Sequence, residues 1–82
     1  MEIIRIELIA TGFLGSKKSA KHDTEIIIKE YICPITVRKL LIDARIKVDF
    51  LGLIMLNGES IHQDFLIETS CRIKLFPILG GG

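Results

Sequence analysis

One segment of the chain has helical periodicity, and the segments around it have the pattern of strands. Its apolar residues recur at helical spacing and fall on a single face: Val37, Leu40, Leu41 and Ala44. Thr36 stands at the N-cap position, and Ile35 precedes it as part of a hydrophobic staple. The pattern predicts a helix over residues 37–46, with basic side chains near its C-terminal end. Because one helix can cover only one face of one sheet, this segment limits the folds that the chain can adopt.

Period-two alternation marks the expected strands. In residues 2–9 the apolar side chains Ile4, Ile6 and Leu8 fall on one face, and a mixed set falls on the other. The remaining strands are expected at residues 24–30, 50–56, 59–62 and 72–76. The Asn57-Gly58 step before the short fourth strand is the strongest short hairpin signal in the chain. In the connection over residues 63–70, Leu66 is predicted to be a buried anchor.

The expected order is strand, strand, helix, strand, short strand, strand. The simplest assembly pairs the first and last strands in parallel at the centre of one mixed sheet, because a long crossover containing the helix joins them. The expected fold class is therefore α+β, a β-grasp (ubiquitin-like) roll with one main helix packed on one face. Residues 1–82 then form a single domain that ends in a flexible C-terminal glycine tail at 78–82.

Composition narrows the classes of function. Hydrophobic residues are 49% of the chain and the mean hydropathy is +0.45, so an apolar patch is expected to reach the surface. A net charge of +1 lacks the basic surplus of a nucleic-acid-binding protein. The longest apolar run, over residues 50–56, is too short to span a bilayer, and charged residues interrupt the apolar N-terminus. We therefore expect a cytoplasmic protein that binds neither nucleic acid nor a membrane.

The side chains that could carry chemistry are scattered along the chain. Cys33 and Cys71 lack metal-ligand spacing and are expected to be buried thiols in a reducing compartment, with a disulfide as the alternative. His22 and His62 are isolated, and no carboxylate pair has an evident acid–base spacing, so no metal site is expected. The basic run over residues 17–22 is expected to be a solvated loop, with a contact to an acidic partner or a phosphate as the alternative.

The chain ends in an apolar strand, a proline, two aliphatic residues and three glycines: Phe76-Pro77-Ile78-Leu79-Gly80-Gly81-Gly82. Glycine tolerates nearly any φ and ψ, so such a tail can thread a narrow channel and present the Gly82 carboxylate to a partner's active site. The alternative is a frayed terminus or a cloning remnant.

A partner-binding surface is predicted beside this tail. Phe76, Lys74 and Arg5 are expected to share the sheet face away from the helix, with Ile3 or Ile9 nearby. An aromatic residue among aliphatic and basic groups is typical of an interface anchor, and ordinary packing under a loop is the alternative. Pro77 and Ile78 are expected to belong to the same surface.

The element order and the terminal diglycine resemble the ubiquitin-like sulfur carriers, which include the small subunit of molybdopterin synthase and the thiamine-pathway carrier ThiS. The resemblance spans the whole chain in topology and depends on Asn57-Gly58, Leu66 and the Phe76-Pro77 step before Gly81-Gly82. The small residue Gly80 before the diglycine is more similar to the molybdopterin synthase subunit than to ThiS. A departure is the sequence 69–71, Thr-Ser-Cys, where such carriers often have a Gly-Asp turn.

The resemblance implies a carrier that is not itself an enzyme and binds no cofactor. An E1-like adenylyltransferase would use ATP to convert the Gly82 carboxylate to an acyl-adenylate, and a sulfur donor would displace AMP to leave a thiocarboxylate. The molybdopterin synthase large subunit, or another acceptor enzyme, would receive the sulfur. Three alternatives stay open: a thiamine-pathway sulfur carrier, a protein modifier joined to target lysines through Gly82, and an interaction domain whose glycines have no chemical role.

Overall fold

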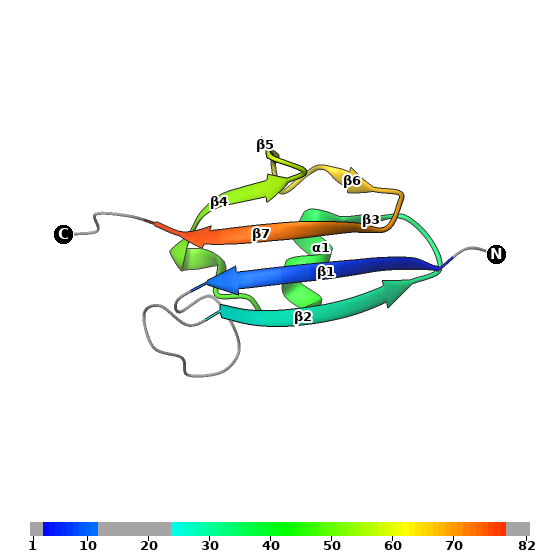
Figure 1. Cartoon of the computed structure of the whole chain (residues 1–82), viewed down its shortest axis with the longest axis horizontal. Coiled ribbons are helices and arrows are strands. Elements are labelled where there is room, and N and C mark those ends of the chain that lie inside the picture. Colours follow the sequence, from blue (N-terminus) through cyan, green and yellow to red (C-terminus); the bar gives the residue numbers. More distant parts are fainter. Residues whose placement is uncertain (1–2, 12–23, 79–82) are drawn as a thin grey trace.

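The computed structural model describes residues 3–11 and 24–78, which form an α+β unit with a mixed sheet (Figure 1). Its elements in chain order are β1 (Ile4–Thr11), β2 (Thr24–Tyr31), β3 (Ile35–Thr36), α1 (Val37–Asp43), the 3-10 helix η2 (Val48–Phe50), β4 (Leu51–Leu56), β5 (Glu59–Ser60), β6 (Leu66–Ile67) and β7 (Cys71–Pro77). Five strands form one sheet in the order β2-β1-β7-β4-β5, and β3 pairs with β6 separately. None of the described helices is both long and apolar enough to cross a membrane.

The first and last strands lie side by side at the centre of the sheet, as predicted. β1 runs parallel to β7, with Leu8 opposite Ile73, while β2 and β4 flank this pair in antiparallel orientation. Two side-chain hydrogen bonds join β1 and β7 at the two ends of the parallel pair. Thr11 Oγ1 donates to the Leu75 carbonyl at 2.9 Å, and Ser70 Oγ accepts from the Arg5 backbone N–H at 2.9 Å. Ser70, in the segment 69–71 that leads into β7, thus links β1 to the start of β7.

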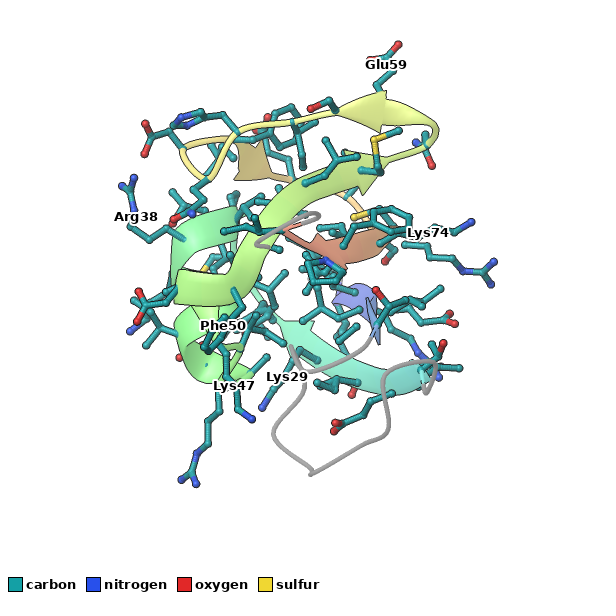
Figure 2. All side chains as sticks on the ribbon, turned by 90° about the vertical axis from the view of Figure 1, so that its left-hand side faces the viewer. Lys29, Arg38, Lys47, Phe50, Glu59 and Lys74 are labelled. Carbon is teal, nitrogen blue, oxygen red and sulfur yellow. The ribbon has the colours of Figure 1, made fainter. Side chains whose placement is uncertain are left out.

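The core lies between the sheet and α1. The residues of β1 and β7 that alternate toward the helix are buried, as are the predicted apolar residues of α1: Ile6, Leu8, Ile73, Leu75, Val37, Leu40 and Leu41 are all 0% exposed. Each such aliphatic side chain contributes about 1.5–3 kcal/mol of transfer free energy. Figure 2 shows α1, with Arg38, on one side of the sheet and Lys74 extending from the other. The sheet therefore has one covered face and one open face.

The helix begins as predicted but ends three residues early. Thr36 Oγ1 accepts from the Lys39 N–H at 3.2 Å, which confirms the N-cap. Arg45 adopts φ 58°, so the chain leaves the helix, and the Ile46 N–H donates to the Leu41 carbonyl at 3.0 Å. This is the hydrogen-bond pattern of a Schellman motif, formed here without glycine. The left-handed residue turns Ile46 into the core, where it is 7% exposed.

The connection between β5 and β7 differs from prediction at one residue. Leu66 is 46% exposed, whereas its neighbour Ile67 is 2% exposed and is the buried anchor. Pairing explains the difference, because Ile67 lies opposite Ile35 in the β3–β6 ladder and shares its core-facing side. The same connection accepts hydrogen bonds from the first turn of α1 through the Phe65 and Gln63 carbonyls.

The Asn57-Gly58 turn is confirmed. Asn57 has φ 52° and Gly58 has φ 83°, the backbone signs of a type I′ turn, and the turn joins β4 to β5.

The prediction of two buried thiols is wrong for Cys33, which lies exposed in the bend after β2, and Cys71 is half-buried at the start of β7. Both cysteines are free thiols, so no disulfide joins them.

Candidate functional site: the open sheet face and the end of β7

The open face of the sheet is formed by the side chains of β7 that alternate away from the core. Ile73 and Leu75 are buried, so Arg72, Lys74 and Phe76 project to the opposite side. Strand register then sets their neighbours. Lys74 lies between Ile9 on β1 and Met55 on β4, and Phe76 lies opposite Leu53 on β4. The open face thus places aliphatic, aromatic and basic groups side by side.

A groove of about 460 Å³ runs across this face and ends at the hairpin turn between β4 and β5. We call it the open-face groove; its lining residues are Leu53, Met55, Asn57, Gly58, Arg72, Lys74 and Phe76. Its apolar side chains are accessible, since Leu53 is 41% and Phe76 36% exposed. An accessible aromatic ring flanked by aliphatic groups is typical of an interface anchor.

Two basic side chains of β7, Arg72 and Lys74, line the groove. Arg72 Nε lies 3.6 Å from Glu7 Oε1, an exposed ion pair that offsets part of its charge. Lys74 takes part in none of the ion pairs found among the described residues. The groove therefore combines an apolar floor with an uncompensated ammonium group, which favours a partner that carries both apolar and acidic groups.

Only some residues of the predicted partner-binding surface lie together in the structure. Phe76 and Lys74 share the groove, and Ile9 lies beside Lys74 as expected. Arg5 is on the same face but level with Ser70, six residues before Phe76 along β7 and so roughly 20 Å from it. Ile3 lies beyond Arg5 and is 58% exposed. Arg5 and Ile3 therefore lie far from Phe76, beyond the end of the groove that Arg72 lines.

The end of β7 is held against β4 by a close backbone approach. The Ile78 N–H donates to the Phe50 carbonyl at 2.8 Å, and Pro77 pairs with Leu51. A β-bulge between Leu51 and Leu53 brings Gly52 under this segment, where an added Cβ would lie 3.0 Å from Ile78 Cα and from the Pro77 carbonyl oxygen. A side chain at position 52 would therefore displace the Pro77–Ile78 segment from β4.

Gly52 is a site residue that was not predicted from the sequence. Its signal was a glycine inside an apolar strand, which often marks a bulge or a close backbone approach. Pro77 is half-buried and Ile78 is 56% exposed at the point where the described chain ends. The predicted tail residues Gly80, Gly81 and Gly82 lie outside the described residues, as do His22 and the basic run over 17–22.

Two perturbed ionisable groups lie away from the groove. Burial, followed by the hydrogen bond and charge of Asp43, raises the pKa of Tyr31 from 10.0 to about 12, and Tyr31 Oη donates to Asp43 Oδ2 at 3.0 Å. Burial also raises the pKa of the Cys71 thiol, which disfavours its thiolate form.

His62 Nδ1 lies 3.4 Å from Asp64 Oδ2 on the exposed surface. Within residues 3–11 and 24–78, no three His, Cys, Asp or Glu side chains gather closely enough to hold a metal ion.

Comparison with protein-family models and with curated proteins finds no match to this chain.

Proposed function

We propose that this chain is a ubiquitin-like sulfur carrier in which the terminal carboxylate of Gly82 holds the sulfur. We infer the β-grasp fold from the parallel β1–β7 pair at the sheet centre, the antiparallel strands on both sides and α1 in the crossover. The observation that carries the proposal is the end of β7. The strand that leads to the glycine tail is fixed between β1 and β4, and it ends beside an accessible apolar and basic groove.

The proposed chemistry needs no catalytic side chain from this protein. The E1-like adenylyltransferase transfers AMP from ATP to the Gly82 carboxylate, which releases pyrophosphate and gives an acyl-adenylate. A sulfide equivalent then attacks the acyl carbon, the bond to the phosphate oxygen breaks, and AMP leaves with the electron pair of that bond. The product is a thiocarboxylate, whose sulfur can be passed to an acceptor.

The proposed partners use the open-face groove as a docking surface. Phe76 supplies the apolar anchor and Lys74 the charge that selects a partner with an acidic group. The distance from this anchor to Gly82 is six residues, or at most about 20 Å of extended chain. A partner that binds the groove could therefore receive the tail in its own active site. We propose the molybdopterin synthase large subunit as the sulfur acceptor, on the resemblance of the Phe76-Pro77 step and Gly80.

Analysis of the protein recovered from its own cells tests the proposal. Its C-terminal peptide should end at Gly82 and show the mass of an oxygen-to-sulfur replacement, and alkylation of the thiocarboxylate should trap that species. A Gly82 joined to the side-chain amine of a lysine in another protein would favour the protein-modifier alternative. A C-terminal peptide that carries neither sulfur nor a conjugated lysine would contradict both.

A further inference from the structure

The outer edge of β2 is eight residues long, and among the described residues no strand pairs with it. Such an edge presents backbone N–H and C=O groups that can template another strand. Ile26 and Ile28 project to the open face and are 59% and 48% exposed. Glu25 and Lys29 share the opposite side, because they lie across from the buried residues Ala10 and Ile6 of β1.

Self-pairing of this edge is restricted to a few registers. Two copies of β2 can pair antiparallel only in registers that differ by steps of two residues, because outward-directed backbone groups must face each other. Centred on Ile27, the pairing places Glu25 opposite Lys29 of the second copy and Ile26 opposite Ile28 of the second copy. Centring it on Ile26 puts Glu25 opposite Ile27, and centring it on Ile28 puts Lys29 opposite Ile27. Both shifts set a charge against an aliphatic side chain.

We propose that the chain self-associates through β2, as a two-fold symmetric antiparallel pair centred on Ile27. In this pair Glu25 and Lys29 of the two copies form two ion pairs across the new strand junction. This charge complementarity favours a second copy of the chain over an extended segment of another protein. A lysine within an edge strand disfavours pairing with apolar strands in general, so the same charges make the edge selective.

The self-pairing surface is separate from the open-face groove. β1 lies between β2 and β7, so pairing at β2 leaves Phe76 and the end of β7 accessible. The inference therefore holds whether or not Gly82 carries sulfur. A contact along one strand edge is smaller than a standard protein interface, so we expect weak association, with a dissociation constant on the order of 100 µM.

Sedimentation equilibrium of the full chain, over concentrations that bracket this value, tests the proposal. Glu25→Lys and Lys29→Glu each place like charges opposite one another at both symmetric positions, and each should raise the dissociation constant about tenfold. The double variant Glu25→Lys/Lys29→Glu should return within about threefold of the wild type. Within one copy the two positions are about 13 Å apart, beyond the range of a screened ion pair, so recovery reports a contact between copies.

Glu30→Lys is the matched control. It carries the same change of charge on the same strand, but in the proposed register it faces Thr24 of the second copy. It should change the dissociation constant by less than about threefold. Where circular dichroism shows that a charge-reversal variant is unfolded, Ile26→Lys replaces an exposed side chain instead and should weaken association about tenfold.

Three results would overturn the proposal. The first is a wild-type chain that stays monomeric throughout, including one that instead binds a foreign extended peptide along β2. The second is a double variant as weak as the single variants, which would exclude the register centred on Ile27. The third is association that Ile26→Lys leaves unchanged.

Discussion

Replacing Gly52 by alanine should loosen the end of β7 while leaving the rest of the fold in place. An added Cβ would lie 3.0 Å from Ile78 Cα and from the Pro77 carbonyl oxygen. Carbon atoms in good contact are about 3.5–4.0 Å apart, so the strand end must move by roughly 0.5–1 Å. That shift stretches the 2.8 Å hydrogen bond from the Ile78 N–H to the Phe50 carbonyl.

The expected magnitude follows from this hydrogen bond. Its loss costs about 1 kcal/mol, and the lower entropy of the unfolded alanine variant offsets about 0.5 kcal/mol. The global free energy of unfolding should therefore change little. Local opening at the strand end should become about fivefold more frequent, because 1 kcal/mol corresponds to that factor.

Amide hydrogen exchange at Ile78, followed by nuclear magnetic resonance, measures this opening directly. Ile67→Val is the control, since it removes a buried methyl group and costs about 1 kcal/mol, and Ile67 belongs to the separate β3–β6 pair and not to β4 or β7. The Ile78 amide should exchange faster in Gly52→Ala and at the wild-type rate in Ile67→Val. Unchanged protection of Ile78 in Gly52→Ala would refute the close approach as the reason for glycine at this position.

Further predictions concern the groove, the helix end and one titrating group. Phe76→Ala should weaken binding of the E1-like partner by about 2 kcal/mol in calorimetric titration. A large loss of stability with intact binding would assign Phe76 to packing alone. Arg45→Gly should stabilise the protein by about 1 kcal/mol in denaturant titration, because Arg45 has φ 58°; a loss of stability would contradict the strain. The raised pKa of Tyr31, about 12, means that its stabilising contribution is present below about pH 10 and is lost as the pH rises toward 12. In spectrophotometric titration Asp43→Asn should lower this pKa toward 10, and an unchanged midpoint would exclude Asp43 as a cause.

The parts of the fold that local patterns determine could be predicted from the sequence. Alternation at Ile4, Ile6 and Leu8 predicted the buried face of β1, and the helical spacing predicted the buried face of α1. The Asn57-Gly58 turn needed only its own backbone preferences. The parallel β1–β7 pair followed because a long crossover that contains the helix joins the first and last strands.

The features that depend on tertiary contacts were not predicted. Arg45 carries no local sign that it leaves the helix with positive φ, since the residue usual at that position is glycine. Leu66 and Ile67 are equally apolar, and only the β3–β6 pairing decides which of them enters the core. At the site, alternation along β7 predicted that Lys74 and Phe76 share a face, but the register that separates Arg5 from them is a property of the assembled sheet.

The central claim, that the Gly82 carboxylate is the reactive group, is tested most directly by adding one alanine after Gly82. The addition moves the carboxylate by about 3.5 Å and leaves every core residue unchanged. With ATP, the E1-like enzyme and a sulfur source, the wild-type protein should gain the mass of an oxygen-to-sulfur replacement at its C-terminus, and the extended protein should keep its fold and gain none. Equal thiocarboxylate formation by both proteins, with the added alanine still present, would contradict the account.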